Sequence, residues 1–267
     1  ADIATVKVEA YLTDDLRVEN KTRLGETLND YIVSTYSATR DNNLRQFTGW
    51  QENQYVGNQT NFIFDAELFG KKHSIVTGVE YANEKTDIGN YTVTTDNSFS
   101  IDPYNAQNNL WEGSVTRSDV TKAVELNTLS AYLMDTVTLS DDWEVHGGIR
   151  YDYFDYDGFV AATTDRQGNA VAEKNYNFSD GFFNGHLGAV FSPWEHGNVY
   201  ATWSTSSNIN GGEVDAVSSC GYGGVCVDSD GNYANAEPEQ STNLELGNKW
   251  NVMDHKLLLT AAAFQIT

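Results

Sequence analysis

Hydrophobic and polar residues alternate along most of this chain, and the alternating segments meet in pairs at short polar turns. In the segment 143–153, for example, Val145 and Ile149 occupy one set of alternate positions, and His146 and Arg150 occupy the other. A period of two residues indicates β-strands, because successive side chains of a strand point to opposite faces of its sheet. The pattern therefore predicts an all-β protein.

Ten strands are expected from this pattern, and their two ends differ. The predicted strands cover residues 2–12, 16–36, 45–69, 73–87, 117–139, 143–158, 175–192, 198–208, 239–252 and 256–267. Short turns join them in pairs at residues 13–15, 70–72, 140–142, 194–197 and 253–255. The connections at the other ends are longer, and the longest run from about 88 to 117 and from about 208 to 237. We therefore expect antiparallel hairpins with a short-turn end and a long-loop end.

The length of the strands and the content of their polar face favour a membrane protein. Strands of soluble sandwiches usually stop at about five or six residues, whereas several strands here keep the alternation for much longer. Ten residues tilted by about 40° rise roughly 25 Å, which is the height of the lipid-facing band of an outer-membrane barrel. Charged residues occur at mid-strand on the polar face, where a water-filled lumen accepts them and a packed core does not. Aromatic residues gather near both strand ends, as two interfacial girdles would. We therefore predict a transmembrane antiparallel up-and-down β-barrel.

The composition argues against several other classes of protein. The chain has 38 acidic and 16 basic residues and a formal net charge of −22, which does not suit binding to nucleic acid phosphates. Its longest nearly apolar run, residues 257–264, is too short for a membrane helix, which needs roughly 20 apolar residues. No Gly-x-Ser-x-Gly motif occurs, and we do not expect an enzyme. The first residues lead directly into a strand pattern and do not resemble a signal peptide.

The two cysteines lie in one glycine-rich run. Cys220 and Cys226 enclose the sequence Gly-Tyr-Gly-Gly-Val, and we predict a disulfide within this loop. A disulfide would imply an oxidising compartment, while two free thiols remain the alternative. A metal site is not expected there, because none of the histidines lies near the pair.

Two other groups of titratable residues are candidates for binding ions or protons. The acidic run 151–157 lacks the Gly and the distal Glu of an EF-hand loop, and alternation divides its carboxylates between two faces. We interpret it as a solvated strand end. His146 and His186 are expected on the polar face, in contact with water.

Several segments resemble the barrel of TonB-dependent siderophore receptors, and they occur in the same order as in that family. They span residues from about 60 to the end of the chain and are residues 73–81, 130–136, 143–152, 188–193, 238–250 and 253–264. The run PEQSTNLELGNKW at 238–250 is similar to the late strand of the family that a Pro-Glu opens and a Gly-x-Lys-Trp ends. The resemblance implies a 22-stranded barrel in the outer membrane of a Gram-negative bacterium, an N-terminal plug domain, and uptake of ferric siderophores powered by the TonB complex. We expect residues 1–267 to be an internal barrel segment, without the plug or the TonB-contacting segment.

A ferric siderophore is bulky and often anionic, so its site needs flat aromatic surfaces together with cations and hydrogen-bond donors. Residues of these types toward the long loops are predicted to bind the ligand: Trp50, Tyr55, Phe99, Tyr104, Trp111, Arg117 and Tyr222. No cofactor is expected, since the ferric siderophore is the transported ligand. The other expected partners are the TonB complex, outer-membrane lipid and lipopolysaccharide, which acidic loops can meet through bridging divalent cations.

Two other functions remain open from the sequence. A passive outer-membrane porin would have an open lumen and no plug. A secreted β-rich adhesin would have its polar faces outside and its apolar faces packed inside. The ligand class also remains open among catecholate, hydroxamate and mixed siderophores, with catecholate preferred.

Overall fold

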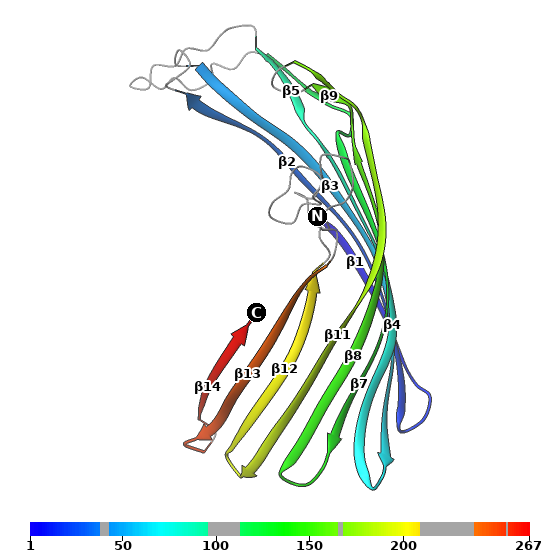
Figure 1. The fold of residues 1–267 in the computed structure, drawn as a ribbon, viewed down its shortest axis with the longest axis vertical. Coiled ribbons are helices and arrows are strands. Elements are labelled where there is room, and N and C mark those ends of the chain that lie inside the picture. The colour runs from blue at the N-terminus through cyan, green and yellow to red at the C-terminus, as the bar shows by residue number, and fades with distance from the viewer. Residues whose placement is uncertain (38–42, 96–112, 165–167, 209–237, 255) are drawn as a thin grey trace.

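The structure is a computed structural model that describes residues 1–37, 43–95, 113–164, 168–208, 238–254 and 256–267 (Figure 1). Within these residues, ten strands form one open sheet, and each strand pairs antiparallel with its neighbour in chain order. They are β1 (Asp2–Tyr11), β2 (Leu16–Ser37), β3 (Asn43–Leu68), β4 (Lys71–Gly89), β7 (Lys122–Thr138), β8 (Trp143–Val160), β11 (Lys174–Trp194), β12 (Gly197–Asn208), β13 (Glu239–Val252) and β14 (Leu257–Ile266). The predicted all-β, antiparallel, up-and-down arrangement is confirmed.

Two small hairpins are additions that the alternation does not predict. β5 (Tyr91–Thr95) pairs with β6 (Gly113–Arg117), and β9 (Thr163–Thr164) pairs with β10 (Ala170–Val171). Figure 1 shows β5 and β9 at the end of the sheet opposite to the short turns. Arg117 therefore ends β6, whereas the alternation predicts it at the start of a strand of the main sheet. No described segment forms a helix with the length and apolar character needed to cross a membrane.

The short turns lie together at one end of the sheet, as predicted (Figure 1). Between β3 and β4 the turn consists of Phe69 and Gly70, with φ angles of 54° and 70°. Two consecutive residues with positive φ match a type I′ turn, whose twist fits that of the flanking strands. Glycine adopts this conformation without the strain that a Cβ atom introduces.

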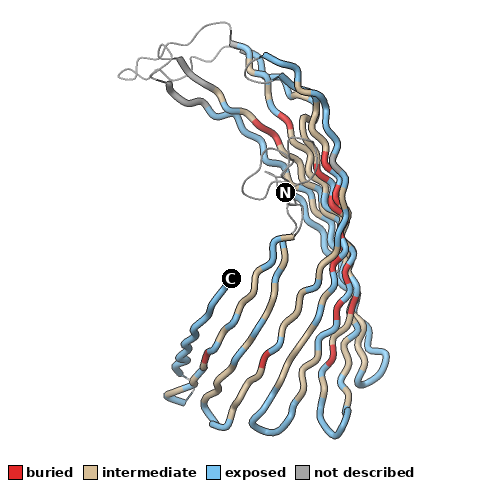
Figure 2. The backbone as a smooth tube through the Cα atoms, viewed as in Figure 1, coloured by how far each residue is buried: buried red, intermediate tan, exposed pale blue. Residues whose placement is uncertain are grey.

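The curvature of the sheet separates its two faces (Figures 1 and 2). A curved sheet brings side chains together on its concave face and spreads them apart on its convex face. On β7, Leu129 and Leu133 are 57% and 49% exposed, whereas Ser130 and Tyr132 between them are only 2% and 7% exposed. Apolar side chains therefore occupy the convex face and polar side chains the concave face, as the barrel prediction requires.

The convex apolar face extends across the sheet without a covering layer among the described residues. Large apolar side chains that are at least two fifths exposed occur on this face of β2, β3, β4, β7, β8, β11, β12 and β13: Leu24, Val56, Phe62, Val79, Leu129, Leu133, Ile149, Phe183, Leu187, Trp203, Leu244 and Leu246. A soluble protein rarely leaves so large a contiguous apolar surface in water. This arrangement fits contact with lipid, and it contradicts the packed apolar interior that the adhesin alternative needs.

Polar groups interrupt the convex face in places, and a cluster on β2 and β3 is one example. Asn20 and Thr22 of β2 lie on the same face as Leu24. Asn20 Nδ2 donates to Thr60 Oγ1 of β3 at 2.8 Å, and Asn58 Nδ2 donates to Thr22 Oγ1 at 2.7 Å. The two asparagine side chains also hydrogen-bond to each other. Polar groups at hydrocarbon depth must find partners within the protein, and this cluster supplies them.

A matched pair of glycine substitutions tests the packing of the two faces. A Cβ atom at Gly78 would lie 2.5 Å from the Thr60 carbonyl oxygen and close to the Tyr132 hydroxyl, whereas one at Gly147 would approach nothing nearer than 3.4 Å. We expect Gly78→Ala to lower the free energy of unfolding by about 1–3 kcal/mol, because the backbone carbonyl cannot move away cheaply. Gly147→Ala should change it little. Denaturant unfolding of the reconstituted full-length protein measures both, and equal effects of the two would contradict the packing described.

Candidate functional site

Arg150 of β8 is the centre of a charged cluster on the concave face. Its Nε atom donates to Asp152 Oδ1 at 2.8 Å, and its Nη1 atom lies 3.1 Å from Glu80 Oε2 of β4. Its Nη2 atom donates to Ser130 Oγ of β7 at 2.8 Å, and Ser130 donates to Asp152 at 2.5 Å. One guanidinium thus joins three strands, and the two groups it holds on β7 and β8 are almost fully buried.

Tyr132 extends this cluster toward β3. Its hydroxyl donates to Asn61 and accepts from Gln59 Nε2 at 2.9 Å, and its ring lies 5.5 Å from the Arg150 guanidinium carbon. To reach β3 from β7, the ring has to cross β4, and it does so over Gly78, where no side chain stands in its way. The glycine therefore allows the concave face to be joined across four strands.

An aromatic core lies farther toward the long-loop end of the same face. Phe154 and Tyr156 of β8 are 0% and 1% exposed. Phe178 of β11 lies edge-on to Phe154, with 5.7 Å between ring centroids, and Phe182 lies 6.1 Å from it. Val124 and Leu126 of β7 complete the core. Phe154 and Tyr156 present almost no surface to solvent, whereas Phe178 and Phe182 are only partly buried.

Trp50 and Arg117, both predicted to bind ligand, lie against each other on the convex side at the long-loop end. The Arg117 guanidinium carbon is 3.8 Å from the Trp50 ring centroid, and its Nη2 atom donates to Glu52 Oε1 at 2.5 Å. Trp50 is only 3% exposed. Trp50 and Glu52 share the face of β3 that carries Phe62, so Arg117 brings the end of β6 onto the convex face.

The start of the same hairpin is fastened to β2 and β3. The Tyr91 amide donates to Thr48 Oγ1 at 3.0 Å, and Thr48 donates back to the Tyr91 carbonyl at 2.8 Å. The Tyr91 hydroxyl donates to Asp30 Oδ2 at 2.9 Å, and this hydrogen bond raises the pKa of Tyr91. The Glu52 carboxylate similarly raises the pKa of Arg117. We call β5 and β6 with these contacts the convex clip, since they hold an otherwise separate hairpin to the outside of the sheet.

The convex clip predicts a local effect of Arg117→Ala. Removing the guanidinium uncovers Trp50 and breaks the bond to Glu52, so we expect the Tyr91 amide to exchange its hydrogen several-fold faster. Hydrogen exchange measured by mass spectrometry over residues 91–95 tests this. Lys85→Ala is the control, because Lys85 pairs with Asp87 at 3.3 Å and makes no polar contact with the described residues of the hairpin. Unchanged exchange in Arg117→Ala would show that Arg117 does not hold the hairpin.

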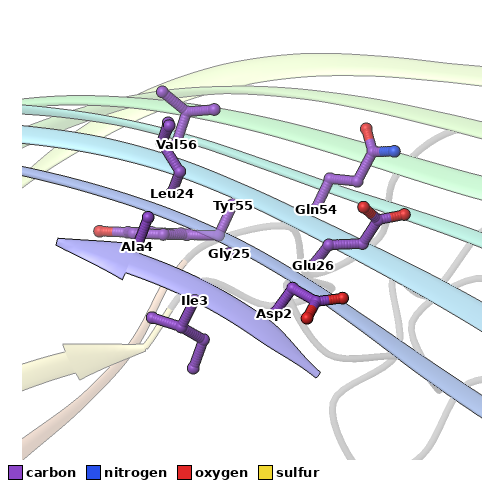
Figure 3. Close-up of a pocket in the computed structure, with 9 residues that line it drawn as sticks. All are labelled: Asp2, Ile3, Ala4, Leu24, Gly25, Glu26, Gln54, Tyr55 and Val56. Atoms are coloured by element: carbon purple, nitrogen blue, oxygen red, sulfur yellow. The ribbon is translucent and has the colours of Figure 1, made fainter.

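Tyr55 is the predicted ligand-binding residue that lies on the concave face. Its side chain covers Gly57, and an open hollow of about 470 Å³ lies beside it, between the start of β1 and the strands β2 and β3 (Figure 3). Figure 3 shows Ile3 and Ala4 on opposite sides of β1, with Leu24 and Val56 on the side of Ala4. The hollow is lined by Asp2, Ile3, Ala4, Leu24, Gly25, Glu26, Gln54, Tyr55 and Val56.

The remaining predicted site residues lie outside the described part of the chain. These are Phe99, Tyr104, Trp111 and Tyr222, together with the predicted disulfide partners Cys220 and Cys226. Their roles stay predictions.

The structure confirms that the strand alternation divides the acidic run 151–157 between the two faces and puts both histidines, His146 and His186, on the concave face. Asp152 lies on the concave face, whereas Asp155 and Asp157 pair with convex-face positions of β7. The interpretation of this run as a solvated strand end is wrong for its concave side, where Asp152, Phe154 and Tyr156 are buried. His146 and His186 share the concave face, with ring centroids 5.9 Å apart. Among the described residues, no three or more His, Cys, Asp or Glu side chains gather as metal ligands would.

The sequence does not predict the cluster around Arg150 on the concave face. Its only signal is that Arg150, Asp152 and Glu80 occupy polar positions of two strands, β8 and β4. Which of these positions meet depends on the register between strands, and register is not visible in any one segment.

The family model described as TonB dependent receptor-like, beta-barrel, matches residues 5–267. The chain belongs to this family. Among curated receptors, it is 27% identical to the catecholate siderophore receptor Fiu of Escherichia coli K12 over 291 residues, covering 99% of this chain and 37% of Fiu. It is also 27% identical to the probable TonB-dependent siderophore receptor PiuA of Acinetobacter baumannii, covering 98% of this chain and 37% of PiuA.

Solved structures of two receptors share the fold. The closed form of the ferric-catecholate import receptor Fiu from Escherichia coli superposes with a TM-score of 0.82 at 25% identity, covering 99% of this chain and 40% of that chain. The siderophore receptor PiuA from Acinetobacter baumannii superposes with a TM-score of 0.76 at 23% identity, covering 98% and 39%. The chain thus spans about two fifths of the length of these relatives.

Proposed function

We propose that this chain is part of the barrel wall of an outer-membrane receptor that takes up ferric siderophores, with energy supplied by the TonB complex. The observation that carries the proposal is the division of one curved sheet into an exposed apolar convex face and a polar concave face, in a chain of this receptor family. The convex face suits outer-membrane lipid, and the concave face suits a water-containing lumen.

The family match also favours a receptor over a passive porin. Relatives with matching barrels are named as siderophore receptors. Fiu and PiuA are each 27% identical to this chain. A catecholate is the preferred ligand class, because Fiu is named as a catecholate receptor. Lipopolysaccharide is the proposed partner of the acidic residues in the long connections, through bridging cations.

The structure gives the predicted ligand-binding residues different settings. Tyr55 lies on the concave face, where a ligand inside the lumen could reach it. Trp50 and Arg117 contact each other on the convex side. We therefore propose that they affect ligand binding indirectly, by holding the hairpin of β5 and β6 to β3. Phe99, Tyr104, Trp111 and Tyr222 remain proposed contacts on the long connections.

Growth under iron limitation tests the proposal. The source bacterium with and without the intact receptor is supplied with one purified siderophore at a time, from the catecholate, hydroxamate and mixed classes. We expect at least one ferric siderophore, with a catecholate tried first, to support growth only when the receptor is present. If no iron source distinguishes the two strains, the siderophore assignment fails while the barrel assignment stands.

A single substitution then tests the long connection. Trp111→Ala should weaken binding of the siderophore identified above, because a flat aromatic surface is lost. Direct binding to the purified full-length receptor measures it, and unchanged affinity would remove Trp111 from the site.

A further inference from the structure

Two histidines and a methionine lie together on the concave face, between the short turns and the Arg150 cluster. His146 belongs to β8, His186 to β11 and Met134 to β7. The ring centroids of the two histidines are 5.9 Å apart, and their planes are inclined by 41°. Met134 and His186 are each directly opposite Gly148 of β8 in the strand register. Three adjacent strands therefore bring these side chains to one part of the wall.

Glycines leave the space in which these side chains meet. A Cβ atom at Gly148 would lie 2.6 Å from His186 Cε1 and 2.9 Å from Met134 Cγ, so the two side chains meet over this glycine. A Cβ atom at Gly188 of β11 would collide with His146 Nε2. A hollow of about 200 Å³ opens beside the group, with Met134 and His186 in its lining.

Elsewhere in the described sheet, tyrosine or tryptophan fills gaps of this kind. Their rings cover the backbone at Gly57, Gly89 and Gly181. Such rings bury more apolar surface than imidazole does, so packing alone gives no reason for histidine at this place. Imidazole nitrogen and thioether sulfur are ligands of late first-row transition ions. The change of residue type therefore alters what this part of the wall can bind.

Neither imidazole of this group is paired with a carboxylate or hydrogen-bonded to another residue in the part of the chain that the structure describes. The other described histidines differ. His73 Nδ1 lies 2.7 Å from Asp135 Oδ2, and His196 lies beside Glu195. A neutral imidazole has one nitrogen with a lone pair, which is the atom that binds a metal ion. Both rings of the group thus have a ligand atom that no described residue engages.

The spacing of the rings fits one shared ion with a wide bond angle. A metal–nitrogen bond of about 2.0–2.1 Å puts an ion roughly 3.1 Å from a ring centroid, so two rings on one ion have centroids at most about 6.2 Å apart. The observed 5.9 Å is close to this limit, whereas a tetrahedral ion would bring the centroids to about 5 Å. Cu(I) accepts wide angles and low coordination numbers. A thioether is also a ligand that Cu(I) takes readily, and three uncharged ligands suit a monovalent ion.

The charge around the group attracts a cation. Across β3 to β13, the row of paired residues through His146 contains Asp65 and Glu245 and no basic residue. In the next row toward the short turns, Lys72 of β4 is matched by Glu144 of β8. The guanidinium of the cluster farther along β8 is already paired with two carboxylates. A carboxylate-rich, low-dielectric wall raises the local concentration of cations.

We propose that His146, His186 and Met134 form a copper(I) site on the lumen wall near the short-turn end. Two imidazole nitrogens and one thioether sulfur are its ligands. Because the third ligand is a methionine, the site is not marked by three or more His, Cys, Asp or Glu side chains, and the described residues contain no such group. The inference goes beyond the proposed function, since it needs only that water reaches the concave face.

Copper binding by the purified full-length receptor tests the site. Metal-free receptor in detergent is titrated with Cu(I) in the absence of oxygen, while a chromogenic chelator competes for the ion. We expect His146→Asn combined with His186→Asn to bind one Cu(I) fewer than the wild type. His196→Asn is the control, because His196 is exposed in the short turn between β11 and β12, and it should bind as much copper as the wild type.

A methionine variant tests the choice of ion. Met134→Leu removes the sulfur and keeps an apolar side chain of similar size. We expect the Cu(I) affinity of the site to fall about tenfold while the Zn(II) affinity stays within about twofold. X-ray absorption at the copper edge should lose the contribution of one sulfur in this variant. An unchanged copper spectrum, or tighter binding of Zn(II) than of Cu(I) at the two histidines, would overturn the assignment to copper(I).

The remaining outcomes concern the histidines. An unchanged number of bound Cu(I) ions in the double histidine variant would overturn the site. If that variant fails to give the heat-modifiable folded band, His186→Tyr decides, because it keeps a ring over Gly148 as tyrosines do over other glycines. Loss of one Cu(I) in folded His186→Tyr supports the site, and full retention overturns it. Growth under iron limitation reports separately on the proposed function, so the two can fail independently.

Discussion

Replacing Leu133 with arginine is expected to cause the largest loss of barrel stability among the substitutions considered. Leu133 is 49% exposed on the convex face, next to Ile149 of β8 and within the apolar band. A charged side chain facing lipid near the midplane costs about 2–4 kcal/mol in an outer-membrane barrel. Reversible unfolding of the reconstituted full-length receptor measures this cost, and the amount of heat-modifiable protein in outer membranes should fall with it.

The adjacent residue supplies the control. Met134 is 39% exposed and lies on the concave face, where its backbone pairs with Gly148. Met134→Arg adds the same charge one residue away and should cost much less, because the concave face is polar. If both arginine variants assembled equally well, the assignment of the two faces would be wrong.

Replacing Arg150 with methionine is expected to have the second largest effect. The substitution leaves Asp152, whose side chain is 8% exposed, without the guanidinium that donates to it, and it also removes the donor to Ser130. Removing one partner of a fully buried ion pair costs about 3–5 kcal/mol, and we expect a smaller loss of about 2 kcal/mol here because the Arg150 side chain is 32% exposed. Denaturant unfolding of the reconstituted receptor should show this loss.

A compensated variant and a surface variant make the test specific. Arg150→Met combined with Asp152→Asn and Glu80→Gln removes the opposing charges and should recover more than half of the loss. Lys85→Met breaks an exposed pair with Asp87 and should cost no more than about 1 kcal/mol. A loss in Arg150→Met no larger than that in Lys85→Met would show that the cluster does not support the wall.

Much of the fold follows from the alternation of residue types. The predicted strand at 143–158 corresponds to β8 at Trp143–Val160, and the short turns fall where the pattern places them. Long connections are harder, because a polar segment can pair as well as loop. The hairpin of β5 and β6 lies within the connection assigned to residues 88–117, and it contacts Thr48 and Glu52 of β3, which are far from it in sequence.

Polar residues on the convex face were also beyond the reach of the pattern. Asp135 of β7 faces the same side as Leu133, and His73 of β4 lies 2.7 Å from it. In the sequence of one strand, a polar residue at a convex-face position only makes the alternation of hydrophobic and polar residues less regular. Its partner comes from a neighbouring strand, so the register decides whether the polar group is satisfied.

The sequence predicts which residue types occur toward the long loops, but it does not predict which of them contact one another. The sequence indicates that Trp50 and Arg117 lie toward the long loops, and they do, but their contact with each other depends on the fold of the hairpin. The concave group Arg150 is visible in the sequence only as a charged position of the alternation. Its pairing with Glu80 depends on the register of β8, β7 and β4.

Lipid contact along β7 shows directly whether the convex face meets the bilayer and the concave face meets water. Nitroxide labels are placed singly at residues 129 to 134 of the full-length receptor in bilayers, and their relaxation is measured with oxygen, which partitions into lipid, and with a water-soluble nickel complex. We expect oxygen accessibility to be high at 129, 131 and 133 and low at 130, 132 and 134. Greater access of the nickel complex at the odd positions, or no period of two residues, would contradict it.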